Sequence, residues 1–143
     1  FMLVYPDADV PIVQLSLQEG LDPATHLAIG RALAPLRDEG VLIIGSGMSY
    51  HNLRELLTGS ARGNDASEHF DAWLTNAVEE PDTGARDNKL THWSEAPGAL
   101  NAHPRSEHLL PLMVAAGAAG TDRGRRVFND RIWGKAISGF QFG

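Results

Sequence analysis

The chain has 143 residues, a length that suits one domain and is short for two. Hydrophobic residues make up 43% of the sequence and charged residues 21%, an ordinary globular balance that excludes disorder and fibrous repeats. Eighteen acidic and twelve basic side chains give a formal net charge of -6, which argues against a non-specific binder of nucleic acid or anionic membranes.

Cysteine is absent, which excludes a disulfide framework, a thiolate metal site and a cysteine nucleophile. The longest nearly unbroken apolar run, 112–120, is far shorter than the roughly 20 residues that a membrane span needs. Because the chain opens without a basic-then-apolar leader, we expect the cytosol as its compartment. The apolar opening 1–5 has no polar lead-in, and we expect that a longer chain is cut there; a cloning scar is the alternative.

The first predicted elements are a strand and a helix. The β-branched apolar run 10–17 predicts a strand. Asp22 and Pro23 form a strong helix-start signal, an N-cap followed by proline at the first helical position. We expect this helix to bend near Pro35 and to end at Gly40. Its predicted buried stripe consists of His26, Ile29, Leu33 and Leu36.

Val41–Ile44 is the clearest strand of the sequence. It shows no alternation, so we expect both of its faces to be covered, as in a parallel sheet between helices. The order strand, helix, strand predicts a right-handed crossover between 10–17 and 41–44. The remaining predictions, in chain order, are a helix (64–80), a polar break (81–88), short helical pieces (90–100), a helix (104–119), a charged loop (121–126) and a final strand (132–142). The pattern as a whole is α/β.

His51 follows the most buried predicted strand, just after a Gly-Ser-Gly turn. Ligands of open α/β sheets bind at the carboxyl ends of the strands, and imidazole can accept and deliver a proton near neutral pH. These two properties make His51 a candidate for proton transfer. The alternative is a loop histidine that caps the helix beginning near Asn52.

His103 and His108 lie around the predicted helix start at Pro104. Residues five apart do not share a helix face, so these two need not bind one metal. His108 is a candidate metal ligand; the alternative is a surface helix start at which Glu107 serves the positive helix end. Pro111 lies inside the same predicted helix, where proline would leave a backbone carbonyl unpaired, and the sequence shows no reason for it.

The other three histidines carry no strong signal. His26 lies on an apolar stripe and is expected to be a satisfied core residue, whereas His69 and His92 lie among charged residues and are expected to be solvated. The Gly-Ser-Gly turn at 45–47 does not match a phosphate loop, and no Gly-x-Ser-x-Gly elbow occurs. A serine hydrolase is therefore not indicated.

Four segments in this order resemble the class III extradiol ring-cleavage dioxygenases, in their DOPA 4,5-dioxygenase branch: YPDADVPIVQLS (5–16), LRDEGVLIIGSG (36–47), HNLR (51–54) and HPRSEHLLPL (103–112). The resemblance implies an α/β sandwich with a mixed sheet flanked by helices. It implies a non-haem Fe(II), or zinc in its place, at one end of that sheet. By the same resemblance His51 is the acid/base residue, His108 is a metal ligand, and His103 lies near the substrate.

The implied reaction opens a catechol-type ring with O2, beside the two hydroxyls, without a nucleic-acid or membrane partner. Two further ligand segments of the family, of His-Gly-Ser-Pro and Ser-Ala-His type, do not occur here. We therefore expect residues 1–143 to form the C-terminal part of a single catalytic domain whose N-terminal half is absent. We expect such a chain alone to bind Fe(II) or zinc weakly, and a complementary N-terminal segment or a second polypeptide, as in a homo-oligomer, would be needed to complete the site.

Two other function classes remain as alternatives. The first is a non-catalytic half-domain that associates with a partner chain through an unfinished sheet edge. The second is a zinc-dependent hydrolase using His51 and His108, although the sequence has no His-Glu-x-x-His pair and no second ligand cluster.

Overall fold

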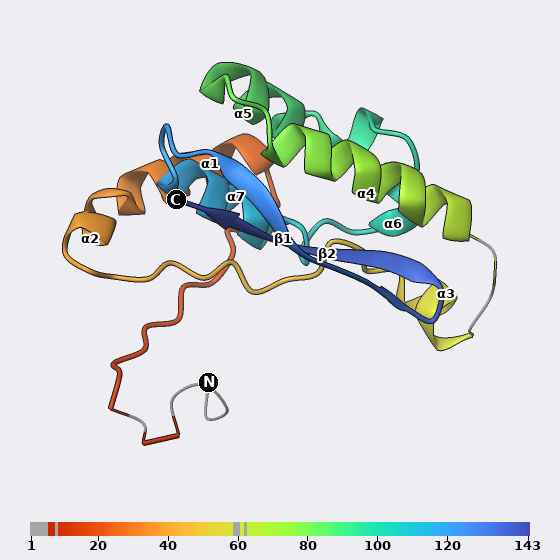
Figure 1. The fold of residues 1–143 in the computed structure, drawn as a ribbon, viewed down its shortest axis with the longest axis horizontal. Helices are drawn as coiled ribbons and strands as arrows, with labels where there is room; N and C mark the ends of the chain where they lie inside the picture. The colour runs from red at the N-terminus through yellow and green to blue at the C-terminus, as the bar shows by residue number, and fades with distance from the viewer. Residues whose placement is uncertain (1–5, 8, 59–60, 62) are drawn as a thin grey trace.

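The computed structural model describes residues 6–7, 9–58, 61 and 63–143, so the apolar opening 1–5 lies outside the described residues. Helix α4 lies against both strands of a β-hairpin, and α1 packs on α7 (Figure 1). This is an α/β arrangement with a sheet flanked by helices, which confirms the predicted class. The elements in chain order are α1 (Pro23–Leu33), α2 (Pro35–Asp38), α3 (Leu53–Leu57), α4 (Asn64–Val78), α5 (Thr83–Thr91), the 3-10 helix η1 (Trp93–Glu95), α6 (Ala99–Ala102), α7 (Leu110–Ala118), β1 (Gly124–Ile132) and β2 (Lys135–Phe142).

The sheet of the described residues is an antiparallel hairpin, with a register from Gly124 opposite Phe142 to Ile132 opposite Lys135. Its turn has positive φ at Trp133 (49°) and Gly134 (81°), the signs that a tight two-residue hairpin turn requires. The final strand is confirmed in β2, but the predicted loop at 121–126 is wrong from Gly124 onward. Because β1 is exposed along nearly its whole length, it lacks the apolar pattern that would mark it as a strand.

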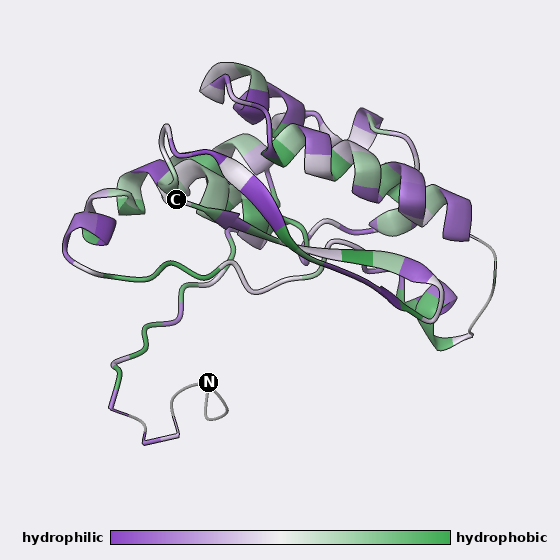
Figure 2. Ribbon diagram, in the orientation of Figure 1, coloured by the Kyte–Doolittle hydropathy of each residue, from purple (hydrophilic) through white to green (hydrophobic). Residues whose placement is uncertain are grey.

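The two apolar runs predicted as strands join no sheet among the described residues. Both 10–17 and 41–44 run outside the hairpin, so the two strand predictions are wrong and the crossover between them is not formed. Val13 is 93% exposed and Leu42 is 72% exposed. A strand needs a neighbouring strand to pair with its backbone groups, and none of the described residues form such a strand beside these runs. Figure 2 shows hydrophobic colouring along the trace that leaves α2.

The predicted helix at 22–40 is confirmed with a break. Asp22 accepts a hydrogen bond from the backbone N–H of Thr25 at 2.7 Å, and the chain divides into α1 and α2 just before Pro35. The buried face differs from the predicted stripe: besides His26 it consists of Leu27 and Gly30, while Ile29, Leu33 and Leu36 stay partly or largely exposed. A Cβ on Gly30 would lie 2.1 Å from the carbonyl oxygen of Val114, so close packing on α7 selects this face.

The helix predicted at 64–80 is confirmed as α4, whereas two other boundaries need correction. The predicted polar break at 81–88 is wrong, because Asp82 accepts from the N–H of Ala85 at 2.7 Å and begins α5. The helix predicted from Pro104 begins only at Leu110. Pro111 therefore lies in the first turn, where its missing N–H leaves no bond unmade. His108 lies in the connection before α7 and not inside the helix.

The core lies between α4, α7 and β2, where side chains such as Phe70, Leu74, Leu110 and Met113 are fully buried. The guanidinium of Arg86 is buried beside it and donates to the carbonyl oxygens of Ala116, Gly120 and Asp122 at 2.8–3.0 Å. Ala116 lies in the last turn of α7, where carbonyl groups lack helical partners, and Gly120 and Asp122 lie in the segment that follows the helix. In the described part of the chain, none of the helices combines the length and apolarity needed to cross a membrane.

Candidate functional site: a stacked histidine pair

The imidazole rings of His51 and His108 are stacked on each other. Their centroids are 3.4 Å apart and their planes differ by 18°. His51 lies at the end of the long connection between α2 and α3, whereas His108 lies in the connection between α6 and α7. The structure thus brings together two of the three histidines that the sequence singles out.

Backbone hydrogen bonds place these rings opposite each other. A Cβ on Gly47 would lie 2.1 Å from the carbonyl oxygen of His108, so only glycine allows the two connections to approach this closely. The hydrogen bonds that join residues 48–52 to residues 101–108 include Met48 N to His108 O (2.9 Å), His51 N to Ala102 O (2.9 Å), and Asn52 Nδ2 to Asn101 O (2.8 Å).

The capping role considered for His51 is filled by its neighbour. Asn52 is the N-cap of α3, and its side-chain oxygen accepts from the N–H of Glu55 at 3.2 Å. The ring of His51 takes no part in that cap and stacks on His108 instead. Its side chain is therefore available for chemistry.

Electrostatics favour a neutral His51. Burial lowers the pKa of His51 below its ordinary value, the positive charge that His108 can carry lowers it further, and the Glu107 carboxylate opposes both. The pKa of Glu107 is itself lowered, chiefly by a hydrogen bond from its own backbone N–H. Because the ordinary pKa of histidine is about 6.5, a lowered value leaves the His51 ring neutral near pH 7 and able to accept a proton.

His103 is 0% exposed and lies in the core. Its Nε2 donates to the carbonyl oxygen of Ser49 at 3.0 Å, and its ring lies edge-on to Phe70 and Trp93, with centroids 5.4 and 5.8 Å away. Burial lowers the pKa of His103 to about 4. Substrate contact stays a prediction for this residue, which the structure encloses within the core.

The expectations for the remaining histidines agree with the structure. His26 is 0% exposed; its Nδ1 donates to the carbonyl oxygen of Asp22 at 2.7 Å and its Nε2 accepts from the N–H of Gln18 at 3.2 Å. It is a satisfied core histidine. His69 and His92 are exposed.

Sequence reasoning missed three residues that surround the pair. The Tyr50 hydroxyl donates to the side-chain oxygen of Asn101 at 3.2 Å, and burial raises its pKa to about 12. Ser49 links two further parts of the fold, since its carbonyl accepts from His103 and its hydroxyl accepts from the N–H of Ser138 in β2 at 2.8 Å. No local pattern marks these residues; the only signal is their position, one or two residues before His51 or His103.

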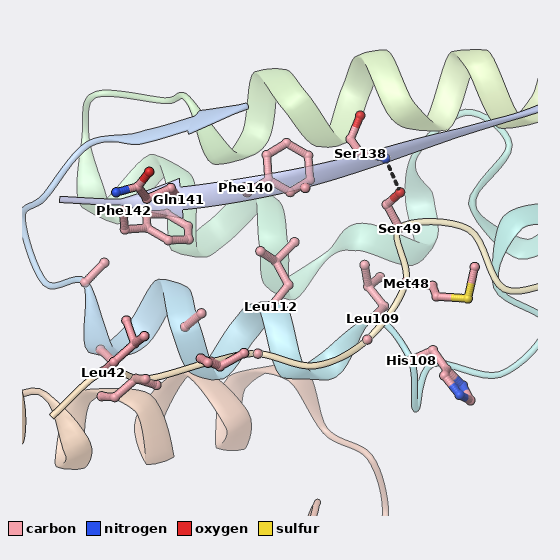
Figure 3. Close-up of a pocket in the computed structure, with 18 of the residues that line it drawn as sticks. Leu42, Met48, Ser49, His108, Leu109, Leu112, Ser138, Phe140, Gln141 and Phe142 are labelled. Atoms are coloured by element: carbon pink, nitrogen blue, oxygen red, sulfur yellow. Dashed lines mark hydrogen bonds between the residues drawn. The ribbon is translucent and has the colours of Figure 1, made fainter. Parts of the chain in front are cut away.

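A groove extends from His108 along the face of α7 (Figure 3). Its volume is about 450 Å³, and His108 borders it while His51 does not. One wall is formed by residues 41–49, the other by β2, and the floor is apolar and comes from α7. The groove is therefore a feature next to the histidine pair and not the space between the rings.

The side chains of the candidate site could supply part of the ligand set of a metal ion. Nδ1 of His108 is buried and has no hydrogen-bond partner among the described residues, a state that suits a ligand. A catalytic metal takes about three protein ligands. Within the described residues, however, no group of three or more His, Asp or Glu side chains could hold a metal ion. His108 therefore fits as one member of a larger ligand set.

Comparison with known proteins identifies relatives over nearly the whole sequence. Residues 1–140 match the family described as the catalytic LigB subunit of aromatic ring-opening dioxygenase. The chain is 44% identical over 119 residues to "4,5-DOPA dioxygenase extradiol" of Beta vulgaris, covering 83% of this chain and 43% of that protein. It is 39% identical over 139 residues to the protein of the same name from Portulaca grandiflora, covering 96% of this chain and 50% of that protein.

A solved structure shows the same fold. The crystal structure of uncharacterized protein JW3007 from Escherichia coli K12 superposes with a TM-score of 0.78 at 29% identity. The match covers 99% of this chain and 59% of the crystallised chain. The chain thus spans about half the length of the curated relatives it matches.

Proposed function

We propose a ring-opening function for this chain, which belongs to the family of the catalytic LigB subunit of aromatic ring-opening dioxygenases. The reaction we propose is extradiol cleavage, in which a catechol-type ring is opened beside its two hydroxyls and both atoms of O2 enter the product. The names of the plant relatives support this reaction class. Because the chain spans about half of those relatives, the activity is proposed for a completed domain and not for these 143 residues alone.

The observation that carries the proposal is the stacking of His51 on His108 at 3.4 Å. In our proposal His51 takes a proton from a catechol hydroxyl and later returns one to the opening ring. Its lowered pKa supports this role, because a neutral imidazole can accept the proton near pH 7. The backbone N–H of His51 donates to the carbonyl oxygen of Ala102 at 2.9 Å, which fixes the main chain from which the ring projects.

His108 would be one ligand of the metal, which its buried and unpartnered Nδ1 supports. When bound, Fe(II), or zinc in its place, would supply the positive charge that holds both catechol oxygens, and Fe(II) the redox chemistry that activates O2. The remaining ligands come from a complementary segment, because one histidine does not retain such an ion against water. His103 would act from the core, through the backbone that carries His51.

A chimera tests the proposal. The residues of this chain that align with the Beta vulgaris relative replace the matching segment of that protein, so that the rest of that protein completes the domain. Oxygen uptake and the absorbance of a ring-opened product are recorded after a catechol is added to the iron-loaded chimera. We expect turnover by the chimera and none by the 143-residue chain alone. A chimera that folds and binds Fe(II) but consumes no oxygen with any catechol would refute the proposal.

A further inference from the structure

Two serine hydroxyls accept hydrogen bonds from the backbone of β2. The N–H of Ala136 donates to the hydroxyl of Ser67 at 3.2 Å. The N–H of Ser138 donates to the hydroxyl of Ser49 at 2.8 Å, the dashed bond of Figure 3. Residues two apart in a strand turn their N–H groups the same way, so the two serines hold the same edge of β2, the one away from β1.

These two serines belong to different parts of the fold. Ser67 lies in α4, and its hydroxyl also donates to the carbonyl oxygen of Asn64 in the same helix at 2.7 Å. Ser49 lies in the connection between α2 and α3, two residues before His51. Both serines are buried, at 0% and 7% exposed. The two bonds are therefore alike in kind and in burial, but one holds a helix and the other holds the segment that carries His51.

Ser49 is a junction between three parts of the molecule. Its carbonyl oxygen accepts from Nε2 of His103 in the core at 3.0 Å. On either side of it, the N–H groups of Met48 and His51 donate to carbonyl oxygens within residues 102–108, at 2.9 Å each. The hydroxyl of Ser49 adds a support from the hairpin. The main chain before His51 is thus held by the core, by the segment that carries the partner ring, and by β2.

The support from the hairpin reaches the connection from the side opposite to the imidazoles. In Figure 3 the Ser49 side chain points toward β2, whereas the His108 ring points away from it. The rings of His51 and His108 are only 3.4 Å apart, so a small shift of the connection changes how they face each other. Displacement of a reacting group by about 1 Å can lower a rate about 10²-fold. A bond that fixes this connection therefore bears on proton transfer by His51.

We propose that Ser49 is a positioning residue for the ring-opening reaction. Its hydroxyl, held by the N–H of Ser138, fixes the main chain from which His51 projects and so keeps the His51 ring stacked on His108. Ser49 acts through His51 and does not itself transfer the proton. The effect on the reaction rests on the function proposed for His51, whereas the effect on the ring geometry does not depend on any reaction.

The geometric test compares Ser49→Ala with Ser67→Ala, which each remove one hydroxyl acceptor from the same edge of β2. Nuclear magnetic resonance of the metal-free chimera measures amide exchange and the nuclear Overhauser effects between the His51 and His108 rings. We expect the amide of Ser138 to exchange at least about 10-fold faster in Ser49→Ala, and that of Ala136 in Ser67→Ala. The ring contacts should weaken in Ser49→Ala and remain in Ser67→Ala.

The kinetic test uses the same variants in the iron-loaded chimera. We expect Ser49→Ala to lower kcat about 10- to 100-fold with KM and iron content nearly unchanged, because the proton-transfer ring is displaced while the substrate and metal keep their contacts. Ser67→Ala should leave kcat within about twofold, since its bond does not hold the His51 connection. Ser49→Thr keeps the hydroxyl and borders the groove, which has room for a methyl group, so it should restore most of kcat.

Three results would overturn the proposal. The first is an equal loss of ring contacts or of kcat in both alanine variants, which would make the serine bonds merely structural. The second is Ser49→Ala with an exposed Ser138 amide but unchanged ring contacts. The third is a folded Ser49→Thr whose kcat is as low as that of Ser49→Ala. If the unaltered chimera opens no catechol, the proposed function fails, and the ring contacts of the metal-free variants still decide the role of Ser49.

Discussion

Nε2 of His103 donates a hydrogen bond to the carbonyl oxygen of Ser49, two residues before His51. A carbonyl only accepts, so Nε2 carries the ring proton and Nδ1 is the unprotonated nitrogen. His103 is 0% exposed and Ser49 is 7% exposed, so this bond is shielded from water. We infer that His103 is a positioning residue, which holds the backbone from which His51 projects.

Removing this ring should destabilise the chain. His103→Ala leaves a cavity beside Phe70 and Trp93 and an unpaired Ser49 carbonyl, and we expect a loss of about 2–4 kcal/mol in the free energy of unfolding. The control is His92→Ala at an exposed position, where we expect a change within about 0.5 kcal/mol. Urea unfolding of both variants measures the difference. Equal effects would show that the bond to Ser49 contributes nothing.

The same residue predicts how stability depends on pH. Its pKa is lowered from 6.5 to about 4 in the folded chain, so between these values the unfolded chain binds a proton that the folded chain does not. The contribution of the neutral His103 ring to the free energy of unfolding is therefore complete above about pH 6.5. It is lost as the pH falls toward 4, and the loss amounts to up to about 3 kcal/mol. His103→Gln keeps an N–H donor but does not titrate. Its unfolding free energy should fall less between pH 7 and pH 4.5; an identical fall would contradict the assignment.

Gly47 should be intolerant of a side chain. Gly47→Ala places a Cβ 2.1 Å from the carbonyl oxygen of His108, so the two connections must separate and the Met48–His108 bond is lost. We expect a destabilisation of about 1–3 kcal/mol and loss of the nuclear Overhauser effects between the His51 and His108 rings.

Gly84→Ala is the control for that change. Its Cβ would lie 3.4 Å from the Asp82 carboxylate in α5, an ordinary contact, so we expect a gain of about 0.5–1 kcal/mol from helix propensity. Ring contacts that survive unchanged in Gly47→Ala would contradict the close approach.

In the iron-loaded chimera, substitutions of the two stacked histidines should have different effects. We expect His51→Ala to keep its iron and to lose about 10²–10⁴-fold in turnover, because a proton-transfer group is removed. We expect His108→Ala to lose iron, measured by metal analysis after dialysis. Iron lost from His51→Ala and retained by His108→Ala would reverse the two assignments.

The sequence predicts the elements whose signals are local. Asp22 and Pro23 mark the start of α1 because a cap and a proline act within one turn, and the apolar face of 64–80 marks α4 because helical spacing is short-range. Asp82 carries the same kind of signal for α5, but the polar residues around it conceal the helix. Family resemblance singles out the histidines, and their stacking then depends on contacts distant in sequence.

The features that the sequence does not predict are those that depend on contacts with distant parts of the chain. Residues 41–44 have the composition of a central strand, but a strand forms only beside another, and the described chain supplies none. In β1 the reverse holds, because pairing with β2 makes a strand from a run that is charged and exposed. The links made by Ser49 could not be foreseen either, since both of its bonds reach residues more than fifty positions away.

The bonds that align His51 with His108 come mostly from the main chain. Met48 and His51 each donate through a backbone N–H, and His108, Ala102 and Asn101 each accept through a carbonyl. These hydrogen bonds therefore use groups that do not depend on the side chains of Met48 and Ala102, although Ala102 is fully buried in the core. The mutual orientation of the two imidazoles thus follows from the course of two backbones, and position 47 constrains that course because a Cβ there would lie 2.1 Å from the carbonyl oxygen of His108.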